Sequence, residues 1–208
     1  MSVKDFWMDE LRTAAILGVV MSLFSIFEKY VLLFSDMTVV SASMVVLLKS
    51  IVATCLFVAI LYYFTRRLSR NWRDVVEVGG QTFEVKFSYG RALSYILMSS
   101  MMAGIVVGVA NTIFVDVVGF DVYIANIIAR LEEMRALMAP YSALAGTGQD
   151  VDIIIGQQIE LIESQVQSSI IINILSSMSS YMMYGGLVGL VVAAVARRKP
   201  NTQNESEI

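Results

Sequence analysis

The sequence predicts an all-α membrane protein. Four transmembrane helices are expected, with an extracytoplasmic helical hairpin between the third and the fourth and a small cytoplasmic β-hairpin between the second and the third. Three observations support this fold class. The chain has 208 residues, of which 57% are hydrophobic, whereas a soluble domain is roughly half apolar. Its apolar residues gather in four long runs, and its basic residues gather in alternate connections between them.

The four runs define a single membrane domain at residues 1–199, followed by a tail at 200–208 that is expected to be disordered. The third run is the clearest, because no ionised residue lies between Arg91 and Asp116. At ~1.5 Å per residue it extends about 36 Å, enough to cross a hydrocarbon core of ~30 Å. The first run is too long for a secretory signal. The spans are expected at residues 13–34, 41–64, 91–118 and 169–196.

Lysine and arginine determine the expected orientation. They gather after the second and fourth runs, whereas the other connections hold few of them, and basic connections stay in the cytoplasm. The sequence therefore places both termini in the cytoplasm. The arginines after the second run also suit contact with anionic lipid headgroups, although topology determination alone is the favoured interpretation. These arginines are Arg66, Arg67, Arg70 and Arg73.

One connection carries a strand pattern. Residues 74–87 alternate between apolar and polar positions around Gly79 and Gly80, which is typical of a β-hairpin. An isolated hairpin is marginally stable in water. The sequence therefore predicts a hairpin that leans on the membrane or on a partner.

Small residues recur at every fourth position of the third and fourth runs. Such a face allows two helix backbones to approach closely, which is how helices associate in lipid. We expect the two faces to meet, because the two spans are antiparallel neighbours. The residues that define these faces are Gly104, Gly108, Gly185 and Gly189.

The segment at 119–168 predicts two helices outside the membrane. Apolar residues follow heptad spacings in both halves, so the halves are expected to pack as an antiparallel hairpin that projects outward as an acidic rod. Gly119 is expected to interrupt the first helix, and a loop at 139–149 to join the two. Helices lying flat on the membrane are disfavoured, because interfacial helices usually carry basic polar faces. The expected seam comprises Ile124, Ile127, Leu131, Met134, Ile155, Ile159, Ile162 and Val166.

Two charged residues lie deep in the first two spans. Glu28 and Lys49 are expected about 10–13 Å below the outer surface, where an unpaired charge costs about 2–4 kcal/mol. A structural ion pair between them is favoured over a proton or ion relay, because the spans offer few further acids. Lys29 is expected to extend outward to the interface.

The other polar residues of the spans offer little chemistry. Asn111, Asp116 and Asn173 lie in the outer halves of the third and fourth spans, where interhelical hydrogen bonds are favoured over a polar cavity shared with Glu28. The chain has no histidine and one cysteine. The serines of the fourth span therefore lack the base that a nucleophile needs, and a disulfide framework is excluded. No catalytic residue, cofactor or metal is expected.

The motif Phe87-x-x-Gly90-x-Ala92 begins the third span, and a basic triplet at 197–199 follows the fourth. With the four spans and the long outer loop, these features resemble the bacterial inner-membrane family known as domain of unknown function 4199. The resemblance covers nearly the whole chain. It implies a four-span fold and an inner-membrane location, and it supplies no catalytic residues. It also implies an association with enzymes of the cell envelope, without a mechanism.

The sequence favours a non-enzymatic membrane scaffold or accessory subunit of an envelope-related complex. Its expected partners are the lipid bilayer and a membrane or periplasmic protein, with a homo-oligomer left open and no nucleic acid. The alternative is a small ion-coupled transporter that uses Glu28 and Lys49. A lipid-modifying enzyme has the least support.

Overall fold

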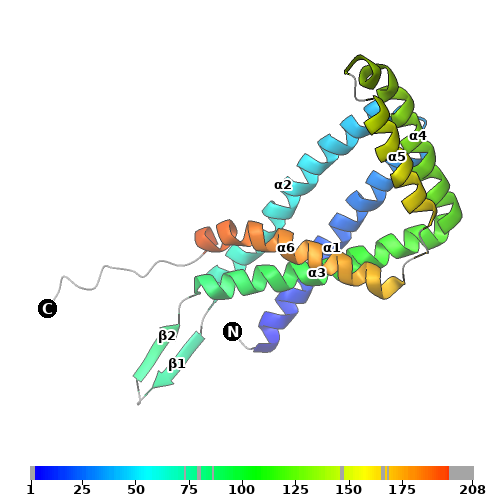
Figure 1. The fold of residues 1–208 in the computed structure, drawn as a ribbon. Coiled ribbons are helices and arrows are strands. Elements are labelled where there is room, and N and C mark those ends of the chain that lie inside the picture. Colours follow the sequence, from blue (N-terminus) through cyan, green and yellow to red (C-terminus); the bar gives the residue numbers. More distant parts are fainter. Residues whose placement is uncertain are drawn as a thin grey trace.

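The computed structural model contains, within the residues that it describes, six helices and one two-stranded sheet (Figure 1). The described residues are 3–72, 74–78, 81–85, 87–145, 148–164, 167 and 169–196. The helices are α1 (Val3–Phe34), α2 (Val39–Asn71), α3 (Tyr89–Val118), α4 (Phe120–Ala145), α5 (Gly148–Glu163) and α6 (Ile170–Ala196). The strands are β1 (Asp74–Val78) and β2 (Gln81–Val85).

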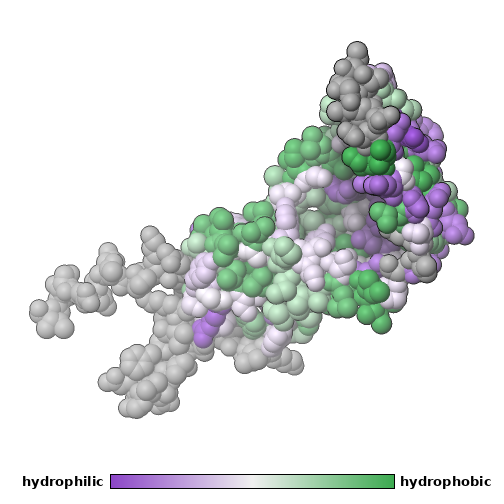
Figure 2. Space-filling view, in the orientation of Figure 1, coloured by the Kyte–Doolittle hydropathy of each residue, from purple (hydrophilic) through white to green (hydrophobic). Residues whose placement is uncertain are grey.

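Four helices, α1, α2, α3 and α6, are long and apolar enough to cross a membrane. The protein is therefore a multi-pass membrane protein. Hydrophilic residues gather around α4 and α5, whereas hydrophobic residues cover much of the surface of the long helices (Figure 2). Helices α2 and α3 begin at N-cap residues. The side chains of Thr38 and Ser88 accept hydrogen bonds from the backbone N–H groups of Ser41 and Arg91, respectively, as N-cap residues do.

Helix α3 lies at the centre of the bundle and packs mainly on α6 and α1. Figure 1 shows α3 and α6 side by side, with α1 and α2 running together at an angle to them. The sheet and the start of α1 lie at one end of the molecule, whereas α4 and α5 lie at the other. The core is apolar around Leu17, Phe57, Leu61, Tyr95 and Ile96, which are all almost fully buried.

The first helix is longer than the sequence suggested. It begins at Val3 instead of residue 13, so the polar lead-in belongs to the helix. Glu10, Thr13, Ala14 and Leu17 lie on one buried face, because spacings of three and four residues place side chains on the same side of a helix. Packing of this face on the core favours helix from the beginning of the described chain.

The predicted fold class needs correction at the connection between α2 and α3. Here β1 and β2 pair antiparallel, with Asp74 opposite Val85 and Val78 opposite Gln81. Within the described residues the strands contact each other and none of the helices. The cytoplasmic β-hairpin is therefore removed from the predicted fold class, because the body of the fold is all-helical and the two strands are not part of it. The glycine pair at 79–80 lies outside the described residues, as do Arg73 and the tail at 200–208.

Gly119 separates α3 from α4, as the sequence predicted. Its φ of +91° lies in the region that favours glycine. Its N–H donates to Val115 O at 2.9 Å, and its carbonyl accepts from the N–H of Tyr123 at 3.0 Å. The chain therefore changes direction while its backbone hydrogen bonds are kept. Helix α4 then continues through Pro140 to Ala145, so the predicted loop at 139–149 begins later than expected.

Helices α4 and α5 pack on each other, but α4 also folds against the turn between α1 and α2. The guanidinium of Arg130 donates to Met37 O at 2.8 Å and to the carbonyl of Ser35, and the N–H of Val39 donates to Glu133 Oε1 at 2.9 Å. The hairpin is thus held against the end of the bundle. It does not project as a free rod, because its apolar stripe also covers the end of α1 and α2.

Candidate functional site

The two charges expected deep in the spans lie together. The ammonium of Lys49 on α2 donates to the carboxylate of Glu28 on α1. The Lys49 side chain is 11% exposed and the Glu28 side chain 38%. A partly buried pair of this kind joins two helices, and removal of either partner would leave the other charge uncompensated.

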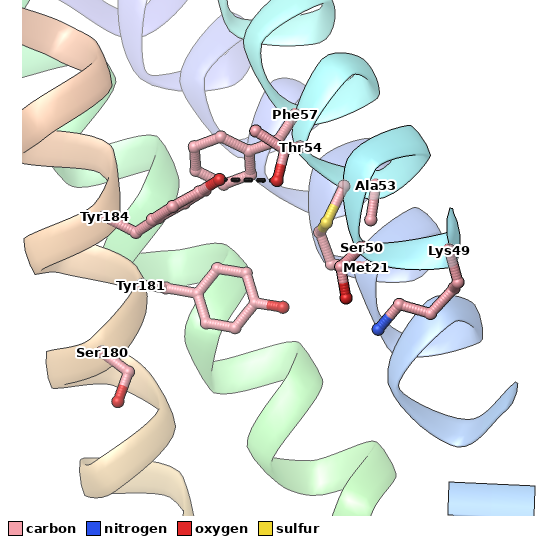
Figure 3. A pocket seen from close by; sticks show the side chains of 9 residues that line it. All are labelled: Met21, Lys49, Ser50, Ala53, Thr54, Phe57, Ser180, Tyr181 and Tyr184. Atoms are coloured by element: carbon pink, nitrogen blue, oxygen red, sulfur yellow. Dashed lines mark hydrogen bonds between the residues drawn. The ribbon is translucent and has the colours of Figure 1, made fainter. Parts of the chain in front are cut away.

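A cleft of about 320 Å³ lies beside this pair, between α1, α2 and α6 (Figure 3). The Lys49 ammonium and the Tyr181 hydroxyl extend into it from opposite sides. The Tyr184 hydroxyl donates to Thr54 Oγ1 at 2.8 Å, which links α6 to α2. The remaining lining is formed by Met21, Ser50, Ala53, Phe57 and Ser180. The cleft therefore combines a cation and hydroxyl groups with apolar walls.

A second cleft of about 320 Å³ lies nearer to α4 and is more polar. Lys29 lines it and does not extend outward as predicted. Its ammonium lies 5.9 Å from the ring centre of Phe114 and 5.6 Å from that of Tyr123. Such cation–π contacts hold a cation at an aromatic wall. Burial raises the pKa of the Tyr123 phenol, so the ring stays neutral.

Two of the three polar residues expected in the outer halves of α3 and α6, Asn111 and Asn173, form interhelical bonds and also line this second cleft. Asn111 accepts from the Ser25 hydroxyl at 2.8 Å, and the amide of Asn173 donates to Thr112 Oγ1 at 3.3 Å. These bonds join α3 to α1 and to α6. Asp116 instead accepts from the amide of Gln167 at 2.6 Å. Glu28 does not line the cleft.

The glycines of α3 and α6 lie at the interface between these helices. Gly104 faces the backbone of Ser177 and Met178, whereas Gly185 faces the Ser100 side chain. Gly108 lies against Asn173 and Ile174, and Gly189 lies against Leu93 and Ile96. The two small-residue faces therefore share one interface, but glycine meets larger residues instead of glycine.

The expected hairpin seam divides among several partners. Ile127, Leu131 and Met134 line an apolar cleft together with residues of α1 and α2, whereas Ile124 lines the polar cleft of Lys29. On α5, Ile155 is buried and Ile159 and Ile162 are half-buried. Val166 lies outside the described residues.

The arginines at the end of α2 are exposed. Arg66, Arg67 and Arg70 lie on the outer side of the last turns. The guanidinium of Arg66 donates to the Tyr62 hydroxyl and lies over its ring.

One buried group was missed by the sequence analysis. Glu10 is 1% exposed, and neither carboxylate oxygen has a hydrogen-bond partner among the described residues. Nearby, the hydroxyls of Thr13 and Tyr95 lie 2.6 Å apart and join α1 to α3. Glu10 lies on the same side of the helix as Ala14 and Leu17, and this spacing in the sequence could have indicated that its side chain is buried.

Four membrane-length helices with charged and polar side chains between them define a multi-pass α-helical membrane protein. Within that class, the chain belongs to the family described as protein of unknown function (DUF4199), whose model matches residues 12–198. The resemblance noted in the sequence is thereby confirmed. No curated protein and no solved structure matches the chain.

Proposed function

We propose that this protein is a non-enzymatic membrane scaffold or accessory subunit of an envelope-related complex in the bacterial inner membrane. Both termini lie in the cytoplasm, and α4 and α5 lie outside it. The observation that carries the proposal is an exposed apolar strip on α5, beyond the spans. Ile153, Ile154 and Leu161 are 55%, 54% and 65% exposed, and helical periodicity places them on one side of α5.

A protein partner suits this strip better than the membrane surface does. The neighbouring polar positions of α5 hold Asp152, Glu160 and Glu163, and helices that lie on membranes usually carry basic residues there. Apolar surface beside carboxylates is instead common at protein interfaces with polar rims. Because Arg130 and Glu133 hold α4 against the turn between α1 and α2 and α5 packs on α4, the strip has a defined position relative to the helical bundle.

Site-specific photo-crosslinking in native membranes tests the scaffold. Photoreactive residues at Ile154 and Leu161 are expected to give one discrete adduct with another protein. The same residue at Glu132, an exposed position on α4, is the control and is expected to give less adduct. Absence of adducts at both α5 positions would contradict the proposal. An adduct of twice the chain's mass would mean that the partner is a second copy of this chain.

Cysteine labelling tests the orientation. The single native cysteine is Cys55, so Cys55→Ser supplies the background. In intact cells an impermeant thiol reagent is expected to label Asp36→Cys, in the turn between α1 and α2, and to leave Gln81→Cys unlabelled. Labelling of position 81 from outside would reverse the proposed orientation.

A small ion-coupled transporter is the second candidate, because the Glu28–Lys49 pair borders the first cleft. A transporter would move its substrate along this cleft, past the Lys49 ammonium. Ion or proton flux in proteoliposomes is expected to fall in Glu28→Gln. Equal flux in this variant and the wild type, or no flux in either, would remove the candidate.

A further inference from the structure

The second cleft is lined by the cationic side chain of Lys29. Lys29 forms no ion pair with any residue that the structure describes. The adjacent carboxylate, Glu28, is directed to Lys49 on α2. Asp116, the acid closest in sequence to the cleft-lining residues of α3, accepts a hydrogen bond from Gln167. The Lys29 ammonium is therefore left with the aromatic rings of Phe114 and Tyr123.

Hydrogen-bond donors that have no acceptor among the described residues line the same cleft. Asn111 uses its carbonyl oxygen to accept from Ser25, so its amide N–H groups are unengaged among the described residues. The hydroxyls of Ser176 and Ser177, on the first half of α6, likewise have no acceptor in the described part of the chain. A cation surrounded by unengaged N–H and O–H donors favours a ligand that only accepts hydrogen bonds.

The depth of the cleft below the end of α1 indicates which ligands can reach it. Lys29 lies five residues before the end of α1 at Phe34, or about 8 Å along the axis. This is close to the depth at which lipid headgroups meet the hydrocarbon. The volume of about 320 Å³ falls within the range of about 300–1,000 Å³ that is typical of small-molecule sites.

We propose that the cleft of Lys29 binds the phosphate group of a small anionic ligand. The ammonium contacts the phosphate oxygens as a point charge, which is how lysine binds phosphate. Asn111, Ser176 and Ser177 donate hydrogen bonds to the same group, and Phe120 and Tyr123 cover the organic part of the ligand. Two sources supply this chemistry: the headgroup of a phospholipid and a soluble phosphate compound.

Thermal unfolding of the purified full-length chain in a neutral detergent tests the soluble source. Inorganic phosphate at ten times its Kd is expected to raise Tm by about 3–6 °C relative to chloride at equal ionic strength. Lys29→Met should abolish this rise. Arg135→Met, which removes an exposed cation paired with Asp152 outside the cleft, should retain it. Unfolding without phosphate shows whether each variant is folded.

Native mass spectrometry tests the lipid source in the same samples. Phosphatidylglycerol is compared with diacylglycerol, which has the same chains and no phosphate. Retention of phosphatidylglycerol by the wild type and by Arg135→Met, reduced about tenfold in Lys29→Met, would assign a lipid headgroup. A phosphate-dependent Tm shift alone would assign a soluble ligand. If neither ligand binds, or if Lys29→Met binds both as well as the wild type, the proposal is wrong.

Discussion

Gly108 is expected to determine how closely α3 and α6 approach. A Cβ atom at this position would lie 2.7 Å from Ile174 Cα and 3.2 Å from Asn173 O. Carbon atoms normally pack at about 3.5–4.0 Å. Both neighbouring atoms belong to the backbone of α6, so a change of side-chain rotamer cannot relieve the clash. Gly108→Ala must therefore move the two helices apart by roughly 1 Å.

The energetic effect follows from this displacement. Overpacking of a close interface costs about 1–3 kcal/mol, and 1 kcal/mol shifts Tm by about 2–4 °C for a chain of this size. Gly108→Ala should therefore lower Tm by about 2–12 °C. The control is Gly156→Ala on α5, where an added Cβ would meet nothing within 4 Å. That change should be neutral or stabilise α5 by about 0.5–1 kcal/mol.

The assay is circular dichroism of the two variants and the wild type, purified in the same detergent and heated at the same rate. The expected order of Tm is Gly156→Ala equal to or above the wild type, with Gly108→Ala below both. If Gly108→Ala unfolds at or above the wild-type temperature, α3 and α6 do not pack at the separation that the structure shows.

Three further predictions concern charged groups. In detergent unfolding, Glu28→Gln or Lys49→Met alone should cost less than the ~3–5 kcal/mol of a fully buried pair, because the Glu28 side chain is 38% exposed, and the double variant should cost less than the two single losses added together; a double-variant loss equal to that sum would exclude a structural pair. Glu10→Met should raise stability by about 1–3 kcal/mol, because it removes a buried carboxyl group whose oxygens have no hydrogen-bond partner among the described residues; a lower Tm would contradict this expectation. The Val39 N–H and then Arg130 hold the pKa of Glu133 below its ordinary value of 4.5. This contact contributes fully above that ordinary value and is lost as pH falls through the lowered pKa, so the protection of the Val39 N–H, measured as its exchange rate relative to the intrinsic rate at the same pH, should fall in acid. Unchanged protection down to pH 3 would contradict it.

The four spans could be predicted because lipid imposes a strong local requirement. A helix must present about 20 apolar residues to cross the hydrocarbon core, and this signal is contained within each run. The interruption at Gly119 was equally local, since glycine there adopts the positive φ at which the chain changes direction. The start of α1 was missed because hydropathy marks the part of a helix in lipid, whereas packing of Glu10 and Thr13 decides where the helix itself begins.

The placement of α4 could not be predicted from its own sequence. Its apolar stripe at Ile127, Leu131 and Met134 fits α5 and the ends of α1 and α2 equally well, because a heptad pattern specifies a buried face and not the partner that buries it. The choice depends on hydrogen bonds such as that from Arg130 to Met37 O, which join residues far apart in sequence. The direction of the Lys29 side chain could not be predicted either, since a flexible lysine side chain at this position can reach the membrane interface or the cleft.

The two proposed sites depend on a single turn of α1. Glu28 and Lys29 are consecutive, so their side chains leave the helix about 100° apart. One direction leads to α2, where Glu28 binds Lys49, and the other leads to the aromatic wall of the polar cleft. The ion pair therefore does more than join α1 to α2: it directs the Glu28 carboxylate to Lys49, so that Glu28 forms no ion pair with Lys29 among the described residues. Loss of Lys49 would free Glu28 to compete for the Lys29 ammonium, and the polar cleft would then lose the charge on which phosphate binding depends.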